Sequence, residues 1–356
     1  MSTTGVTPPR RSSNVETFDV VKTYKKLLSE DPDLTMPVAA IEALIIGLSS
    51  TPASTVSETL DLISTLTSQL KRSVPNSISL SAGTDLFQQY LISNLQRPNG
   101  LAAGGAVGDF EQVRTFLVQN GQGFVERAKA ARDTIAGFGR HFIRDGNTVL
   151  TNGGSRVVGA LLKSAAESSN GRTRGSIRFR VIYVADEKSS ESDENIKTLR
   201  ERDIPVAIIP PTAVAYSMNM VTQCFVGAEG VVENGGIISR MGTYQMGMLA
   251  KAAGKPFYVV SESHKFVRLY PLGQDDLGMD QNVVDFQTAK GSQGEDEGVA
   301  DMDGTAENKD KRNAAMVGNL EESVDYTPPN LISGIITESG VLLPSAVSEE
   351  LIKIWF

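Results

Sequence analysis

Cysteine and histidine are scarce in this 356-residue chain, which contains one cysteine, Cys224, and two histidines, His141 and His264. A single cysteine excludes an internal disulfide framework and any zinc site built from several cysteines. The two histidines lie 123 positions apart, so they form no metal-ligand spacing. A G-x-S-x-G nucleophile elbow is also missing. We therefore expect no metal site and no hydrolase of that type.

The chain also lacks a surplus of basic residues and long hydrophobic runs. Its 34 Lys and Arg residues stand against 42 Asp and Glu, a net charge of −8, which argues against broad binding to nucleic acid. No apolar run approaches the ~20 residues of a membrane span, and residues 1–14 have no apolar signal core. We expect a cytosolic protein with no direct nucleic-acid or membrane partner. With 40% hydrophobic residues, the chain has ample material for a folded core.

The sequence divides into a tail and two domains. Residues 1–14 are rich in Ser, Thr, Pro and Arg, and they predict a disordered tail. Residues 15–145 carry apolar side chains at the three- and four-residue spacings of a helix face, which predicts an N-terminal helical domain. Within it, residues 98–108 read as a loop, one helix resumes near Phe110, and another covers residues 123–144.

Residues 146–356 have a different hydrophobic pattern, in which short apolar runs alternate with helix-compatible stretches. This pattern is typical of a parallel sheet with helices on both faces, so we predict a Rossmann-like α/β domain. Such sheets bind ligands beyond the carboxyl ends of their strands. The expected strands are 148–151, 179–184, 206–209, 224–226, 256–260 and 331–337, and the expected helices are 155–167, 194–202, 213–220, 239–253 and 344–356.

An acidic segment at about 285–320 interrupts this domain. It carries eight acidic and four basic residues with few bulky apolar ones. Because such a segment cannot bury enough surface to offset its ordering entropy, we predict a disordered insertion, in the simplest interpretation a tolerated surface loop.

The first candidate site is Gly153, Gly154, Ser155 and Arg156, where a predicted strand runs through a glycine turn into a helix. Free backbone N–H groups at a helix N-terminus attract anions, and glycines let a phosphate approach closely. The alternative is a tight turn with Ser155 as the helix N-cap. The motif is too short to decide between them.

The second candidate site lies in a glycine-rich stretch after the strand at 224–226. A carboxylate that binds hydroxyl groups, opposite an arginine that binds phosphate, would suit a sugar phosphate. The alternative is that the acids are solvated and the glycines only make turns. The residues concerned are Glu229, Asn234, Ser239, Arg240 and Thr243.

A third, basic stretch covers residues 264–268, with the sequence His-Lys-Phe-Val-Arg. It follows the strand at 256–260 and would cap an anionic pocket, although a lone histidine is more often structural. The structural interpretation is favoured here. Cys224 is most simply a buried strand residue.

Several longer motifs resemble the alpha subunits of eukaryotic translation initiation factor 2B. The resemblance covers nearly the whole chain apart from its first residues and the acidic insertion. The motifs are Val-Gly-Ala-Glu-Gly-Val-Val-Glu-Asn-Gly-Gly-Ile-Ile (226–238), Lys-Pro-Phe-Tyr-Val-Val (255–260), Lys-Phe-Val-Arg-Leu (265–269), Val-Leu-Leu-Pro-Ser-Ala-Val-Ser-Glu-Glu-Leu-Ile (341–352), Val-Ala-Ala-Ile (38–41) and Ser-Leu-Ser-Ala-Gly (79–83).

The resemblance implies a regulatory, non-catalytic subunit of the guanine-nucleotide exchange factor for translation initiation factor 2. Subunits of this kind pair as homodimers through their α/β domains and bridge a decamer with beta, gamma, delta and epsilon subunits. The epsilon subunit carries the exchange activity. The alpha subunits help the complex to sense initiation factor 2 phosphorylated on its own alpha subunit, largely through the helical domain.

Sugar-phosphate isomerases share this fold and are the competing interpretation. The resemblance places their catalytic Cys and Asp at Gly153 and Glu229, and their phosphate-binding Asn-Lys pair at Ser239 and Arg240. Glycine cannot donate a proton, so the acid–base pair is broken. We expect no required cofactor but a pocket that binds a sugar phosphate or a nucleotide monophosphate. A free-standing metabolite-binding protein is the third possibility.

Overall fold

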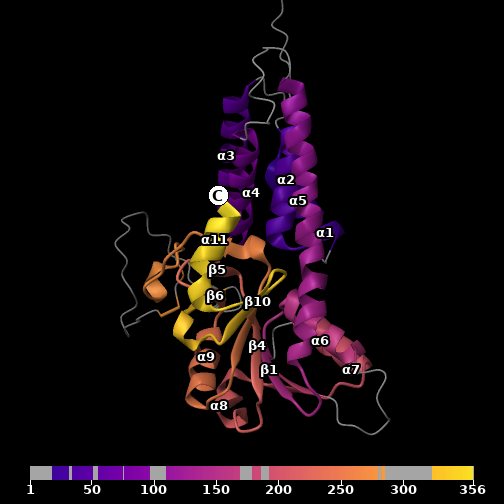
Figure 1. Ribbon diagram of the computed structural model, residues 1–356, viewed down its shortest axis with the longest axis vertical. Helices are drawn as coiled ribbons and strands as arrows, with labels where there is room; N and C mark the ends of the chain where they lie inside the picture. Colours follow the sequence, from indigo (N-terminus) through magenta and orange to yellow (C-terminus); the bar gives the residue numbers. More distant parts are fainter. Residues whose placement is uncertain are drawn as a thin grey trace, which may run out of the picture.

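The computed structural model describes residues 18–31, 34–50, 55–74, 76–96, 110–168, 179–185, 192–279, 281, 283–284 and 323–355. The predicted tail at 1–14, the loop at 98–108 and the acidic insertion at 285–320 lie outside these residues. The described residues form a helical domain at one end of the molecule and an α/β domain at the other (Figure 1).

The helical domain is built around one apolar helix, α2, which packs against each of the other four. Ten of its 15 residues are buried, so it is the core of the bundle. Helices α1 and α3 are amphipathic and begin at side-chain caps: Asp19 accepts from the Lys22 amide at the start of α1, and Thr55 from the Glu58 amide at the start of α3. The helices are α1 (Val20–Glu30), α2 (Met36–Ser50), α3 (Val56–Arg72), α4 (Ile78–Gln96) and α5 (Phe110–Gly139).

Helix α5 is a single helix of 30 residues, so the prediction of two helices, one resuming near Phe110 and another at 123–144, was wrong. Gly121 lies within it, against α2: a Cβ there would come within 2.9 Å of Ile45 Cδ1. The close packing that this glycine permits outweighs its helix-propensity cost of about 1 kcal/mol. The helix ends before a 3₁₀ turn at Arg140–Phe142.

The α/β domain contains a seven-stranded sheet in the order β11-β10-β7-β4-β1-β2-β3. All neighbours are parallel except β11, which pairs antiparallel with β10. The predicted fold class, a helical domain followed by a Rossmann-like parallel sheet, is confirmed. The strands are β1 (Thr148–Asn152), β2 (Arg180–Val184), β3 (Val206–Ile209), β4 (Gln223–Gly227), β7 (Phe257–Val260), β10 (Gly334–Thr337) and β11 (Gly340–Leu342).

Helices cover both faces of this sheet. Helices α6 (Arg156–Ser168) and α7 (Asp193–Glu201) pack on one face with Ile135 of α5. Helices α8 (Val214–Ser217), α9 (Thr243–Ala252) and α11 (Val347–Trp355) pack on the other. No described helix is long and apolar enough to cross a membrane.

A second sheet was not predicted. It has the order β8-β5-β6-β9 and packs against the first turns of α4 through Ile78 and Ala82. The predicted helix at 239–253 was wrong at its start, because Ile237–Arg240 pairs antiparallel with a strand more than 80 residues later. The strands are β5 (Gly230–Val232), β6 (Ile237–Arg240), β8 (Phe266–Val267) and β9 (Val324–Thr327).

Candidate ligand-binding site

A cavity of about 590 Å³ lies at the point where the strand order of the main sheet reverses. Strand β1 has β2 on one side and β4 on the other, so the loops after β1 and β4 diverge and leave a crevice. The volume suits a small molecule. The α/β domain lines the cavity with residues 152–157, Glu194, Asn195, residues 227–229, Ser239, Arg240, Glu262 and Lys265, and the helical domain lines it with residues 35–37, Val74, Asn76 and Ser79.

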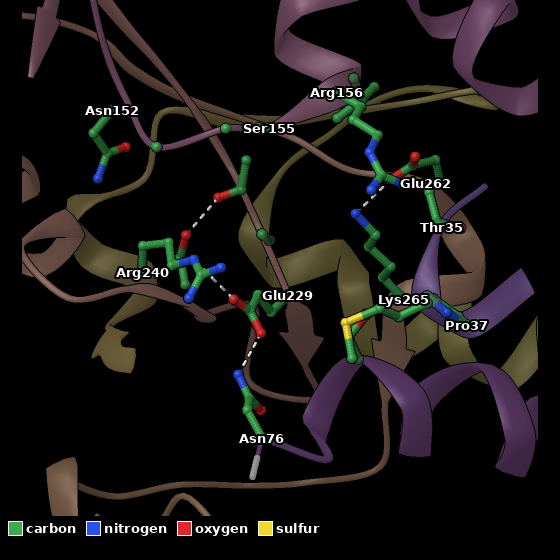
Figure 2. A pocket seen from close by; sticks show the side chains of 18 of the residues that line it. Thr35, Pro37, Asn76, Asn152, Ser155, Arg156, Glu229, Arg240, Glu262 and Lys265 are labelled. Atoms are coloured by element: carbon green, nitrogen blue, oxygen red, sulfur yellow. Dashed lines mark hydrogen bonds and ion pairs between the residues drawn. The ribbon is translucent and has the colours of Figure 1, made fainter. Parts of the chain in front are cut away.

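Most of the site residues expected from the sequence meet in this cavity. The loop after β1 and the loop after β4 face each other across it, with Arg240 from the end of β6 between them (Figure 2). The expected residues that line it are Gly153, Gly154, Ser155, Arg156, Glu229, Ser239 and Arg240.

The turn after β1 depends on two glycines, one within the turn and one on the neighbouring strand β4. Gly153 has a left-handed backbone with φ +65°, and a Cβ on Gly227 of β4 would lie 2.3 Å from Ser155 Oγ. The turn therefore fits tightly against β4 and brings the N-terminus of α6 to the cavity wall. Arg156 opens that helix and donates from Nη1 to the Leu34 carbonyl at 2.5 Å, a bond to the helical domain. Backbone N–H groups at such a helix N-terminus favour an anion.

Glu229 is held from both sides rather than being a solvated loop acid. It accepts a hydrogen bond from Asn76 Nδ2 at 2.5 Å, and Arg240 Nε lies 3.5 Å from its other oxygen. The Glu229 and Arg240 side chains are 23% and 32% exposed, so both still reach the cavity. Ser239, by contrast, donates its hydroxyl to the Gly227 carbonyl and ties β6 to β4. The arrangement can bind hydroxyl groups at Glu229 and a phosphate at Arg240.

A buried ion pair forms the wall beyond β7. Glu262 is 1% exposed, and its Oε2 lies 3.0 Å from Lys265 Nζ. Burial is the largest influence on Glu262 and raises the pKa of its carboxyl, but the Lys265 ammonium, neighbouring His264 and hydrogen bonds to the carboxyl together outweigh it, so that the pKa falls to about 2. Burial lowers the pKa of neighbouring His264 to about 4, so this histidine is neutral and structural near pH 7. Arg268 lies apart, 3.6 Å from Glu233.

Two expected site residues do not line the cavity. Asn234 donates to the Pro271 carbonyl and the Tyr326 hydroxyl, so it holds loops of the second sheet together. Thr243 is fully buried, where it accepts from Asn152 Nδ2 and donates to the Arg240 carbonyl. The N-terminus of α9 is already capped by Asp325, which accepts from the Gly242 and Tyr244 amides.

Several polar residues that line the cavity were missed from the sequence, among them Asn76, Glu262 and Lys265. Glu262 follows β7 at the same sheet edge as Glu229. Because α/β sheets bind ligands beyond the carboxyl ends of their strands, its position in the sequence was a usable signal. Lys265 was noted only as part of a basic stretch. Asn76 carries no sequence signal, because it reaches Glu229 only through the packing of α4 on the second sheet. No cluster of metal-ligating side chains occurs among the described residues.

The model of the Initiation factor 2 subunit family matches residues 29–344. The chain belongs to this family. It is 33% identical over 348 residues to the translation initiation factor eIF2B subunit alpha of Dictyostelium discoideum, covering 95% of this chain and 97% of that protein. A ribose 1,5-bisphosphate isomerase from Archaeoglobus fulgidus is 33% identical over 156 residues, 44% of this chain and 48% of the isomerase.

The same fold occurs in the tetrameric eIF2B-beta2-delta2 complex from C. thermophilum. That structure matches with a TM-score of 0.67 at 17% identity, and the match covers 94% of this chain and 93% of the other. The resemblance to initiation factor 2B subunits inferred from the motifs is therefore confirmed.

Proposed function

We propose that this family member is a non-catalytic regulatory subunit of the cytosolic guanine-nucleotide exchange factor for translation initiation factor 2. The observation that carries the proposal is the likeness to an alpha subunit along 95% of the chain. The test is reconstitution with the other four subunit types: the chain enters the complex and makes exchange sensitive to initiation factor 2 phosphorylated on its alpha subunit. A complex that responds equally without the chain would contradict the proposal.

The residues at the cavity support a non-catalytic role. Where the resemblance puts the isomerases' catalytic Cys and Asp, this chain has Gly153 and Glu229. Gly153 has no proton to give, and Glu229 is engaged by Asn76 and Arg240 rather than left as a base. We expect no turnover of ribose 1,5-bisphosphate or methylthioribose 1-phosphate. Measurable turnover would favour the isomerase alternative instead.

An apolar surface on α8, the turn that follows it and α9 supports the homodimer. Tyr216, Met220 and Met248 are 84%, 55% and 50% exposed, and the two helices pack side by side. Large apolar side chains exposed together are typical of protein interfaces. A homodimer formed through this face of the α/β domain would leave both helical domains accessible to phosphorylated initiation factor 2.

The cavity supports a bound metabolite, a sugar phosphate or a nucleotide monophosphate, that is not a required cofactor. Arg240 and the N-terminus of α6 suit the phosphate, and Glu229 suits hydroxyl groups. Calorimetric titration of the folded protein with ribose 5-phosphate, glucose 6-phosphate and AMP tests this. Binding of none of them would contradict it. Copurification with the other subunits separates an assembled subunit from a free-standing metabolite-binding protein.

A further inference from the structure

The helical domain supplies one wall of the cavity. Thr35 and Pro37 line it at the N-terminus of α2, and Asn76 lines it just before α4. Figure 2 shows Asn76 on the side of the cavity opposite Ser155, whereas Thr35 lies on the side of Arg156. A molecule that fills the cavity would therefore touch both domains.

Two hydrogen bonds cross between the domains beside the cavity. Arg156 Nη1 donates to the Leu34 carbonyl just before α2, and Asn76 Nδ2 donates to Glu229 Oε2 just before α4, each at 2.5 Å. Arg156, Asn76 and Glu229 all line the cavity. The polar connections between the domains at this place thus involve the same side chains that a ligand would meet.

The neighbouring contact between α4 and the second sheet is apolar. Ile78 packs against Val232, Ile238 and Val267, and a Cβ on Gly230 would lie 2.9 Å from Ile78 Cγ2. This packing holds the start of α4 against the second sheet. The hydrogen bond from Asn76 to Glu229 is a directional contact at the same place, so we expect a ligand that engages it to restrain the start of α4 further.

The charges around the cavity balance before any ligand binds. Three basic side chains (Arg156, Arg240, Lys265) face three acidic ones (Glu194, Glu229, Glu262). The first turns of α2, α4, α6 and α7 also lie on the cavity wall, two from each domain. Each helix N-terminus carries a partial positive charge, so the wall favours an anionic ligand.

On the basis of the proposed ligand site, we propose that a monophosphorylated sugar or nucleotide acts as a clamp that fixes α2 and α4 on the α/β domain. Its phosphate binds Arg240 and the N-terminus of α6, and its hydroxyl groups bind Glu229 and Asn76. Glu229 connects the phosphate site to the helical domain because it contacts both Arg240 and Asn76. A ligand in the cavity thereby restrains α2 and α4 of the helical domain.

Hydrogen exchange on the full-length chain, with and without saturating ribose 5-phosphate, tests the clamp. Calorimetry on the same sample records binding separately. We expect the ligand to slow exchange at least fivefold in the first turns of α2 and α4. Asn76→Ser keeps a side-chain oxygen for the Ile78 amide, which Asn76 now caps, but removes the donor to Glu229. This variant should bind the ligand several-fold more weakly and, even when saturated, lose the protection of α4.

The matched control is Gln88→Ser on the same helix, where Gln88 bonds to Thr67 within the helical domain and does not line the cavity. It should retain both binding and protection. Binding without slower exchange in α2 and α4 would overturn the clamp while leaving the ligand site intact. Equal protection in Asn76→Ser at saturation would also overturn it. Absence of binding by the unmodified chain would overturn the ligand site and the clamp together.

Discussion

Asn76 and Glu229 are joined by a hydrogen bond of 2.5 Å although they lie 153 positions apart and belong to different domains. The bond places a residue of the helical domain at the crevice of the α/β sheet. It also engages the carboxylate of Glu229. The cavity is thus connected to the domain that we propose contacts phosphorylated initiation factor 2.

Arg240→Met should weaken binding of ribose 5-phosphate at least tenfold in calorimetric titrations, because a charge-assisted hydrogen bond to phosphate contributes about 1.5–3 kcal/mol. Arg268→Met is the matched control, since Arg268 lies beside Glu233 and does not line the cavity. It should bind as the unmodified protein does. Equal affinity in the Arg240 variant would remove Arg240 from the phosphate site.

Gly153→Ala should lower the thermal unfolding temperature. The φ of +65° costs a residue with a Cβ about 1 kcal/mol, while the nearest atom to that Cβ, Arg240 Cγ, is 3.5 Å away and does not clash. The matched control is Gly137→Ala in α5, where nothing lies within 4 Å of the new Cβ. Alanine is favoured there by about 0.5–1 kcal/mol, so the control should melt at the same or a higher temperature. A lower unfolding temperature in both variants would contradict the argument that the positive φ of Gly153 is the cause.

His264 should make stability depend on pH. Burial lowers its pKa from 6.5 to about 4, despite Glu262 beside it, and Lys265 and Arg132 add to the lowering. As the pH falls from 6.5 toward 4, the unfolded chain takes up a proton at His264 that the folded chain does not, so the contribution of His264 to stability is lost in this window. By pH 5 the loss is about 2 kcal/mol relative to pH 7.5.

Urea unfolding of the unmodified chain and His264→Gln at both pH values measures this loss. The variant lacks the titrating group, so its stability should fall less than that of the unmodified chain. Parallel pH dependence in the two proteins would show that His264 does not titrate as described.

Tyr216→Glu should dissociate the proposed homodimer, because it would bury a charge in an apolar interface. Sedimentation equilibrium over a range of concentrations measures the change in self-association. Leu272→Glu is the control: Leu272 is 82% exposed on the loop after β8, remote from α8 in the sequence. A homodimer unaffected by Tyr216→Glu would place its interface elsewhere.

The main sheet could be predicted because its strands are short apolar runs whose boundaries are local. The runs at 148–151 and 206–209, for example, differ from β1 and β3 by at most one residue. Strand β6 was missed, although it pairs antiparallel with β5 across a local Asn-Gly-Gly turn that is typical of hairpins. Its other partner, β9, lies beyond the acidic segment. Helix α5 was predicted as two helices, and only its packing on α2 shows why Gly121 is tolerated within a single one.

Prediction of the site had the same limit: residues with a local sequence signal were predicted, and residues placed by tertiary packing were not. Gly153 and Glu229 were found because they follow buried strands at one sheet edge, and that edge forms the cavity. Thr243 was expected to bind the ligand, but it is buried, and Asp325 from β9 caps the N-terminus of α9. Asn76 belongs to another domain, so its role depends on how the domains pack.

The central claim is that the chain is a bridging regulatory subunit, and absolute mass from light scattering tests it most directly. Alone, the 38.2 kDa chain should have the mass of a dimer, about twice that value, and with the other four subunit types it should join two of their subcomplexes. A chain that stays at 38.2 kDa, or that never enters the larger complex, would contradict the account.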